Sequence, residues 1–386
     1  MYSSTYLLQI DINLLKQVSF PFLLAFIASI ALIPLIIKLV HKFHLFDKPD
    51  IRKEHSNPIP TLGGIAIVAG TMLALTLWET SFSTTGLYVM AAILLLFIMG
   101  IIDDLRDLKA NVKLLIELAI AAMIAYGGLR ITSLHGLFGI NELPIILQYV
   151  FTIIAIAGVT NAFNLIDGID GLAGGLSLIS LVTAGALLMI SGDHFFALIA
   201  FAMAGGVAGF LLFNYYPAKI FMGDTGSLVI GFVLAVLAIR FMQVNINPIG
   251  EISNIPVIAL SLVLIPVFDT LRVFTFRILN GKSPFNPDKR HLHHLLTNAG
   301  FNHGLVSRLI CFFHALILFQ VILLAHLEQE LVLITSIMLI TLVTLAFKTI
   351  GERRMPAVQK TFASRIENQK LKIKDLILTS NKAVKN

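Results

Sequence analysis

The sequence predicts an all-α polytopic membrane protein, a bundle of ten or eleven transmembrane helices. The 386-residue chain is 57% hydrophobic and only 13% charged, whereas a soluble protein carries about 25% charged residues. Its apolar residues gather in runs close to the roughly 20 residues that a helix needs to cross a bilayer. Lys and Arg fall almost entirely on alternate loops between these runs, which is typical of membrane proteins.

Eleven apolar runs account for the predicted spans, with bounds accurate to a few residues. They are residues 20–42, 62–78, 87–103, 112–128, 144–160, 172–191, 195–213, 226–242, 256–276, 306–326 and 331–348. The runs at 62–78 and 112–128 are barely long enough, so either can be a short or broken span. The first run is too long for the apolar part of a signal peptide, and no cleavage site follows it, so we expect a retained span.

The basic residues predict the orientation of the chain. Only Lys16, Arg130 and Arg240 of the 28 Lys and Arg residues lie on or next to the side that holds the N-terminus. The opposite side is therefore expected to be cytoplasmic, with the N-terminus outside and the C-terminus inside the cell. The net charge of +6 follows from this topology and from attraction to anionic lipid, so it does not indicate nucleic-acid binding.

The chain divides into two parts by composition. Residues 1–350 are expected to form one transmembrane catalytic domain, and residues 351–386 a basic cytoplasmic tail. The tail mixes basic residues with apolar ones such as Phe362 and Ile366, which fits either an amphipathic helix on the inner leaflet or a disordered tail. The single cysteine, Cys311, lies in an apolar run and gives no disulfide framework.

Five polar motifs stand out, and all of them lie on the cytoplasmic side. The first is the loop "FDKPDIRKEHSNPIPTLGG", whose prolines exclude a regular helix and whose Lys53 lies among further cationic donors. Alone, this loop is equally well an ordinary positive-inside loop. Five such motifs on one face, however, indicate a site.

The second motif, "GIIDDLRDLKANVK", ends a predicted span with three carboxylates and includes Lys113. If the helix continues, Asp103 and Asp107 lie on one face as i, i+4 neighbours, held together by a cation or by Lys113. Carboxylates at a helix C-terminus repel one another and oppose the helix dipole, so they favour a bound cation. The alternative is a solvated helix end.

The third motif, "NAFNLIDGIDGLAGG", places Asn161, Asn164, Asp167 and Asp170 between two apolar runs. On a helix, Asn164, Asp167 and Asp170 would point the same way. Polar groups at membrane depth are costly unless they face a cavity or a partner, so these residues are candidates for binding. A purely structural role is the alternative.

The fourth motif, "NYYPAKIFMGDTGSL", places Asp224 between glycines just before an apolar span. A single exposed carboxylate there can hold Mg²⁺, and free backbone N–H groups can bind an anion. A tight turn with an N-capping Asp explains the same letters.

The fifth motif, "NGKSPFNPDKRHLHHLLTNAG", lies in the longest cytoplasmic connection. Arg290, His291, His293 and His294 form a compact group of donors. The spacing of the histidines is similar to that of zinc ligands, but no cysteine lies nearby and the adjacent cations would repel a metal. Phosphate binding by imidazole and guanidinium groups fits better.

Carboxylates for Mg²⁺ and cations for phosphate on one face predict phosphoryl-transfer chemistry. No GxxxxGK[ST] motif is present, so a P-loop ATPase is excluded. A secondary transporter is the main competitor, but it would place its carboxylates near the bilayer midplane, often in paired repeats. A membrane scaffold or sensor would not need five polar motifs on one side.

These motifs resemble the signatures of the polyprenyl-phosphate N-acetylhexosamine-1-phosphate transferases, from about residue 47 to residue 300. Within that family they are most similar to the branch that uses UDP-N-acetylglucosamine. The sister branch, which makes the peptidoglycan lipid precursor from UDP-MurNAc-pentapeptide, typically begins "TPTMGG" and has three consecutive histidines. Here the chain reads "IPTLGG" and "HLHH", and Glu117 stands where the family often has Gln.

The resemblance implies a reaction in the bacterial inner membrane. Undecaprenyl phosphate would attack the β-phosphate of UDP-N-acetylglucosamine, giving undecaprenyl-diphospho-GlcNAc and UMP, the first step of an envelope glycan. Mg²⁺, with Mn²⁺ as a substitute, would be held by Asp224, with Asp167 as a further candidate ligand. Asp103 and Asp104 would lie at the lipid phosphate as the catalytic pair. The implied substrate-binding residues are Lys53, Lys113, Asn161, Asn164, Asp167, Asp170, Arg290, His291, His293 and His294.

Whether the reaction needs a general base depends on the protonation state of the acceptor phosphate. A phosphate monoester has a second pKa near ~6, so the lipid phosphate is mostly dianionic at neutral pH and direct attack is favoured. Adjacent helical residues point about 100° apart, so we expect Asp104 to be freer than Asp103 to meet the lipid phosphate. The sequence leaves open a covalent intermediate, a homodimer and the sugar epimer.

Overall fold

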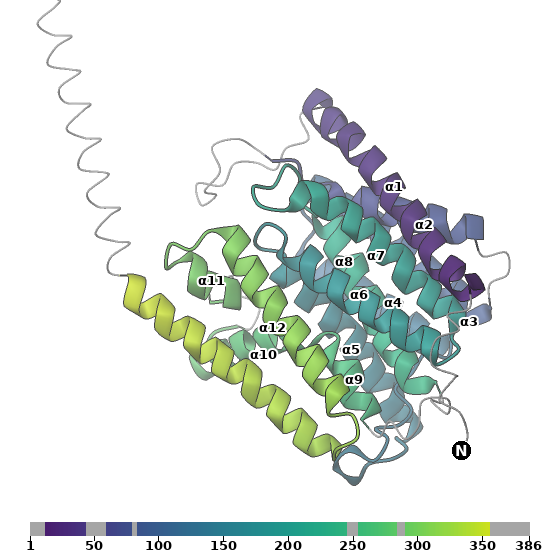
Figure 1. Cartoon of the computed structure of the whole chain (residues 1–386), viewed down its shortest axis with the longest axis vertical. Coiled ribbons are helices and arrows are strands. Elements are labelled where there is room, and N and C mark those ends of the chain that lie inside the picture. The colour runs from purple at the N-terminus through teal and green to yellow at the C-terminus, as the bar shows by residue number, and fades with distance from the viewer. Residues whose placement is uncertain (1–11, 44–58, 79–82, 245–253, 284–289, 356–386) are drawn as a thin grey trace, which may run out of the picture.

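The computed structural model describes residues 12–43, 59–78, 83–244, 254–283 and 290–355 (Figure 1). In these ranges the chain forms helices and no strand; the nearest approach to a sheet is an isolated bridge between Ser133 and Glu142. The helices are α1 Ile12–Phe43, α2 Gly63–Trp78, α3 Thr84–Arg106, α4 Ala110–Tyr126, the 3-10 helix η1 Leu137–Gly139, α5 Ile145–Ile166, α6 Leu172–Ile190, α7 His194–Asn214, α8 Asp224–Gln243, α9 Ile255–Ser261, α10 Leu264–Leu279, α11 Leu292–Thr297, α12 His303–Leu323 and a last helix, Gln329–Met355.

The predicted all-α membrane bundle is confirmed. Among the described residues, eight helices are long and apolar enough to cross a membrane, or nine if the bent pair α9–α10 counts as one span. The two runs expected to be short, 62–78 and 112–128, fall in α2 and α4, which have only 16 and 17 residues. The count of eleven spans therefore stays a prediction.

The run at 256–276, predicted as one uninterrupted span, is broken. Helices α9 and α10 meet at an angle of 77°. Pro266 lies in the first turn of α10, where a residue without an N–H is tolerated, but it could not continue a helix that came from α9. The apolar composition of the run hid this break.

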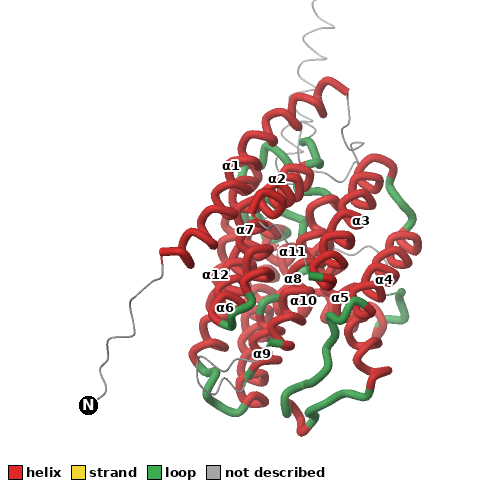
Figure 2. Tube along the Cα trace, turned by 90° about the vertical axis from the view of Figure 1, so that its right-hand side faces the viewer, coloured by secondary structure: helices red, strands yellow, loops and turns green. Residues whose placement is uncertain are grey.

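Helix α8 lies at the centre of the bundle and is its most buried candidate span (Figures 1 and 2). It packs against α2, α3, α5 and α6. Two glycines allow close approach: a Cβ on Gly64 would lie 2.1 Å from the backbone nitrogen of Gly226, and one on Gly100 would lie 2.5 Å from Cα of Thr225. Small residues let helix backbones approach closely in membranes, and here they bring α2 and α3 onto the first turn of α8.

The two ends of the bundle differ in what their loops carry. The ends of α3, α5 and α10 and the start of α8 gather at one end, which we call the site end. The irregular connection between α4 and α5 lies at the opposite end (Figure 2). Lys53 and the tail residues 356–386 lie outside the described residues, and the last helix runs to Met355, past the predicted boundary at 350.

Candidate active site

Asp104, near the end of α3, caps the N-terminus of α8. Its Oδ1 accepts a hydrogen bond from the backbone N–H of Asp224 at 2.8 Å. Its Oδ2 accepts from the backbone N–H of Thr225 at 3.0 Å and from the Thr225 hydroxyl at 2.5 Å. The negative carboxylate therefore lies at the positive end of the α8 dipole, which offsets its unfavourable place at the end of α3. Asp104 is more exposed than Asp103, but its oxygens are occupied as well, so the expectation that Asp104 is the freer of the two aspartates stays a prediction.

Asp103 is buried and faces the next helix. Its Oδ1 accepts a hydrogen bond from the backbone N–H of Leu108 at 2.7 Å, and its Oδ2 forms an ion pair with the Lys113 ammonium group. The expected pairing of Asp103 with Asp107 does not occur, because α3 ends at Arg106 and Asp107 adopts a left-handed backbone conformation with φ 53°. The expected contact of Asp103 with Lys113 is confirmed.

Lys113 joins Asp103 to Asp224. Its Nζ lies 3.0 Å from Oδ2 of Asp224, whose side chain keeps 27% of its surface exposed. The amide of Asn164 also faces Asp224 and donates a hydrogen bond to Ser227 Oγ at 3.1 Å. Asp224 is thus a partly exposed member of a carboxylate centre built from α3, α4, α5 and α8. We call Asp103, Asp104, Lys113, Asn164, Asp167 and Asp224 the carboxylate centre below.

Asp167 and Asp170 do not share a helical face, because α5 ends at Ile166. Asp167 follows that end, and burial together with the charges of Asp224 and Asp104 raises its pKa to about 7. Asp170 is turned elsewhere: its carboxylate accepts from the backbone N–H of Ala218 at 3.0 Å and lies 3.0 Å from Nδ1 of His303. Asp170 thereby ties the α5–α6 loop to the α7–α8 loop and to α12.

Asn161 lies one turn deeper in α5 than Asn164. Its side-chain nitrogen donates hydrogen bonds to the carboxylate of Glu117, which is buried in α4, and to the backbone oxygen of Ala157. The expectation that Asn161 contacts substrate is not tested by these contacts. They do explain what Glu117 does at this position, since it receives the amide of Asn161 one turn beyond Lys113.

Residues 290–294, which we call the histidine segment, are held by Asp269, a buried residue of α10 that the sequence analysis did not single out. Its carboxylate lies 2.9 Å from Nδ1 of His291 and accepts from the backbone N–H of Leu292 at 3.0 and 3.1 Å. Arg272 donates to Asp269 at 2.7 Å and to the backbone oxygen of Arg290 at 2.6 Å. This arrangement leaves Nε2 as the nitrogen of His291 that is available to another group.

His293 packs on the loop that carries Asp167. A Cβ added to Gly168 would lie 2.5 Å from Nε2 of His293, so the glycine is required for this contact. Burial and the neighbouring His294 lower the pKa of His293 to about 3, so its ring is neutral at physiological pH. Its predicted contact with phosphate would therefore be that of a neutral donor. The rings of His293 and His294 lie 4.2 Å apart, and the Arg290 guanidinium lies 3.9 Å from the Phe276 ring.

The donor set of the carboxylate centre fits Mg²⁺. Within the described ranges no three His, Cys, Asp or Glu side chains are grouped to hold a metal by themselves. Mg²⁺ is usually bound by one or two carboxylates, with waters and substrate phosphates completing the shell. Asp224 and Asp167 are oxygen donors of this kind. The pKa of Asp167 is raised mainly by burial and further by the charges of Asp224 and Asp104, and a bound cation would offset those charges.

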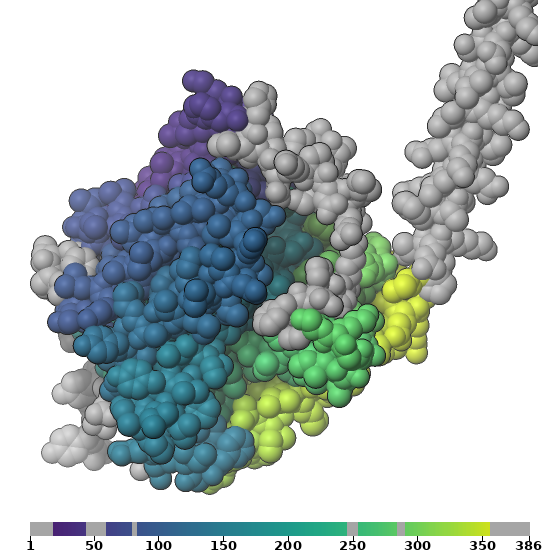
Figure 3. Space-filling model, turned by 180° about the vertical axis from the view of Figure 1, so that it is seen from behind, coloured from purple at the N-terminus to yellow at the C-terminus, as the bar shows by residue number. Residues whose placement is uncertain are grey.

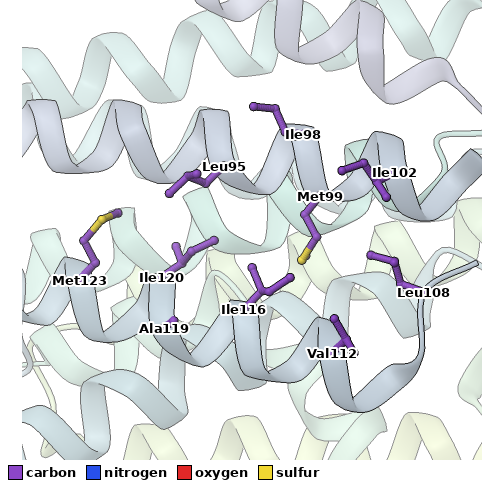
Figure 4. A pocket seen from close by; sticks show the side chains of 10 residues that line it. All are labelled: Leu95, Ile98, Met99, Ile102, Leu108, Val112, Ile116, Ala119, Ile120 and Met123. Carbon is purple, nitrogen blue, oxygen red and sulfur yellow. The ribbon is translucent and has the colours of Figure 1, made fainter. Parts of the chain in front are cut away.

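An apolar groove of about 550 Å³ leads to the carboxylate centre. It lies between α3 and α4, whose residues are blue in Figure 3, and side chains from both helices and from the loop between them line it (Figure 4). The lining residues are Leu95, Ile98, Met99, Ile102, Leu108, Val112, Ile116, Ala119, Ile120 and Met123. At its inner end Leu108 is hydrogen-bonded to Asp103, and Val112 is the neighbour of Lys113. The groove can take a hydrocarbon chain whose polar end lies at Lys113.

Comparison with known proteins gives a consistent group of similar sequences. The model of glycosyl transferase family 4 matches residues 86–242. The chain is 36% identical over 282 residues to an undecaprenyl-phosphate alpha-N-acetylglucosaminyl 1-phosphate transferase of Yersinia pestis, covering 72% of this chain and 76% of that protein. The corresponding protein of Escherichia coli K12 is 34% identical over 270 residues, 68% and 72% of the two chains. A probable undecaprenyl-phosphate N-acetylglucosaminyl 1-phosphate transferase of Bacillus subtilis is 32% identical over 283 residues, 73% and 78%.

Proposed function

Since the chain belongs to glycosyl transferase family 4, we propose that it transfers N-acetylglucosamine 1-phosphate from UDP-GlcNAc to undecaprenyl phosphate. The products are undecaprenyl-diphospho-GlcNAc and UMP. The observation that carries the proposal is the apolar groove whose lining includes Leu108, bonded to Asp103, and Val112, the neighbour of Lys113, because it places a site for a hydrocarbon chain beside a site for phosphate. The names of the similar proteins support the same acceptor and the same sugar.

The acceptor lies along α3 and α4. Leu95, Ile98 and Ile102 are exposed on the outer surface of the bundle, so a lipid chain enters the groove sideways from the bilayer. Its phosphate then reaches Lys113, the ammonium group between Asp103 and Asp224. Asp103 acts on the phosphate through Lys113, since it fixes the position of that ammonium group.

The donor diphosphate lies at the first turn of α8. Asp224, with Asp167 beside it, would hold Mg²⁺, which supplies positive charge to the diphosphate when bound. Asp104 and Thr225 keep the start of α8 in place under Asp224. The donors of the histidine segment, His291 to His294 with Arg290, approach from the α10 side and reach the diphosphate as hydrogen-bond partners.

Direct attack by the lipid phosphate on the β-phosphate needs no general base at neutral pH. The second pKa of a phosphate monoester is near ~6, so the dianion already predominates. Both oxygens of Asp104 are occupied by the start of α8, which favours a positioning role over proton transfer. Catalysis then consists of aligning two phosphates and neutralising their charge.

The reaction takes place at the cytoplasmic face of a bacterial inner membrane. The basic residues support this orientation, with the N-terminus outside and the C-terminus inside. The product is the lipid-linked first sugar of an envelope polysaccharide, such as an O-antigen, a capsule or a teichoic-type glycan.

The test is release of UMP from UDP-GlcNAc by the purified protein with undecaprenyl phosphate and Mg²⁺. A matched pair of variants on α4 checks the groove. Ala119→Trp fills it, whereas Leu115→Trp places the same ring on the exposed surface of the same helix outside the groove. We expect Ala119→Trp to raise the KM for the lipid by about 5- to 10-fold and Leu115→Trp to leave it unchanged. UMP release without lipid, or none with it, would refute the proposed activity.

A further inference from the structure

The break between α9 and α10 leaves one buried carbonyl without its helical partner. In a continuous helix the C=O of Leu262 would accept a hydrogen bond from the N–H of residue 266. That residue is Pro266, which has no N–H. Leu262 is fully buried, so water is not available to replace the missing donor.

Two other helices supply the missing hydrogen bond. Ser180, from the middle of α6, donates its hydroxyl proton to the Leu262 oxygen at 2.6 Å. His314, from the middle of α12, has its Nε2 at 2.8 Å from the Ser180 oxygen. Both side chains are fully buried. Three helices distant in sequence therefore meet at the break.

The direction of these bonds follows from the number of protons. A hydroxyl has one proton, and the contact with Leu262 is shorter than the 3.0 Å contact of Ser180 with Leu176 in its own helix. With that proton used, the Ser180 oxygen accepts from the Nε2–H of His314. Nδ1 of His314 is then a lone pair, and it has no hydrogen-bond partner among the described residues. The series is a neutral one, from His314 to Ser180 to Leu262.

Two other buried serines do not make such a connection. Ser177 lies one turn away on α6 and is equally buried, but it donates only to Ala173 and Gly174 of its own helix. Ser336, in the last helix, likewise bonds to Val332 of its own helix. A polar side chain in the membrane is costly unless a partner uses it, so the bridge from α12 to α9–α10 is a specific feature.

The break positions the histidine segment. Asp269 lies one turn beyond Pro266 on α10 and binds Nδ1 of His291 and the backbone N–H of Leu292. Arg272, one turn further, binds the backbone oxygen of Arg290. The direction in which α10 leaves the break therefore decides where His291 lies.

We propose that Ser180 and His314 are positioning residues: they supply the hydrogen bond that Pro266 withholds, fix the angle between α9 and α10, and so hold His291 at the active site. The effect on catalysis rests on the proposed function, in which the histidine segment meets the donor diphosphate. The effect on the direction of α10 does not.

The first measurement follows the direction of α10 without using activity. In a Cys311→Ser background, spin labels are placed at Leu279→Cys, at the end of α10, and at Leu212→Cys on α7, two exposed positions. The distance distribution between them is recorded for Ser180→Ala and, as the matched control, Ser177→Ala. We expect a broader or shifted distribution for Ser180→Ala and the parent distribution for Ser177→Ala.

A second pair of variants tests His314 and covers the case in which Ser180→Ala does not fold. His314→Gln can keep a donor near the place of Nε2, whereas His314→Leu removes it. We expect His314→Gln to retain the parent distance distribution and His314→Leu to broaden it.

Kinetics then test the link to the site. Ser180→Ala and His314→Leu should raise the KM for UDP-GlcNAc by about 3- to 10-fold, and the KM for undecaprenyl phosphate should stay within about twofold. The proposal is overturned if both variants keep the parent distances and KM values, or if Ser177→Ala changes them as much as Ser180→Ala. If the parent protein transfers no sugar phosphate, the proposed function fails, and the distance measurement still decides on Ser180 and His314.

Discussion

The two ends of the bundle carry charged residues in different ways. At the end opposite the site, each of two arginines has a single side-chain partner: Arg240 donates to the carboxylate of Asp193 at 2.5 Å, and Arg130 donates to the neutral hydroxyl of Tyr149 at 2.7 Å. At the site end, Lys113 alone joins Asp103 and Asp224, with Asp104 and Asp167 close by. Single pairs of this kind hold helices together, whereas an excess of carboxylates in a partly exposed centre favours the binding of a cation.

Replacing Asp224 should have the largest effect and should separate the two ends. Asp224→Asn keeps the shape of the side chain but removes the charge that Mg²⁺ requires, so we expect activity to fall by about 10²- to 10³-fold. Thermal stability should change little, because the lost ion pair with Lys113 is offset by weaker repulsion among the crowded carboxylates. UMP release and the melting temperature in detergent measure both effects. Near-normal turnover with Mg²⁺ as the only divalent ion would remove Asp224 from the metal site.

Asp104 tests whether a residue of the carboxylate centre positions or transfers a proton. In Asp104→Asn the side chain can still accept one hydrogen bond from the start of α8, but its NH₂ group opposes the other donors. We expect a loss of about 10- to 100-fold that is the same from pH 6 to pH 9, because Asp224 is displaced while the dianionic acceptor needs no base.

The pH–rate profile of Asp103→Asn provides the comparison for Asp104→Asn. A deficit confined to low pH in the Asp104 variant, recovering above about pH 6, would mean that Asp104 removes a proton from the acceptor. The role of Asp104 as a positioning residue would then be wrong.

The sequence predicted much of this contrast, and the parts it missed have physical causes. The spans and the polar loops follow from local composition and from the distribution of Lys and Arg along the chain, and both can be read without knowing which residues are in contact. The contact of Asp104 with Asp224 joins residues 120 positions apart, and no periodicity reports it. Asp107 and Asp170 were misplaced for one reason: both predictions extended a helix by a turn beyond the point where the chain leaves it.

The histidine segment shows the same limit. The motif "HLHH" was visible in the sequence, but Asp269 and Arg272, which hold it, lie in an apolar run as single charged residues. Charged residues inside a membrane run were the available signal, since such residues are costly without a partner. Ser180 and His314 are a similar case. Ser180 binds the carbonyl group of Leu262, whose availability depends on Pro266, and His314 binds Ser180.

At the opposite end, removing a charge should affect stability and leave activity unchanged. Asp193→Asn keeps the oxygen that accepts from the backbone N–H of Phe196 at the start of α7, but it leaves Arg240 without its ion-pair partner. Because Arg240 is about a third exposed (34%), we expect a loss of about 1–2 kcal/mol in unfolding free energy, seen as a lower melting temperature. The kcat and both KM values should stay within about twofold. A loss of activity as large as that of Asp224→Asn would mean that the two ends do not differ in the way described.

The smallest expected effect concerns His293, which lies at the site end but is neutral. Its folded pKa is about 3, well below the ordinary 6.5, so the unfolded chain binds more protons between these two values. The stability that depends on this residue is therefore complete above about pH 6.5 and is lost progressively as the pH falls toward 3.

His293→Gln cannot take up a proton, so between pH 7.5 and pH 5.5 its melting temperature should fall less than that of the parent, by an amount corresponding to about 1 kcal/mol. His326→Gln, at an exposed position in the last turn before Gln329–Met355, is the control and should keep the parent slope. An unchanged slope in His293→Gln would mean that His293 is open to protonation in the folded chain. It would then join the cations of the site, and the difference between the ends of the bundle would lie in the carboxylates alone.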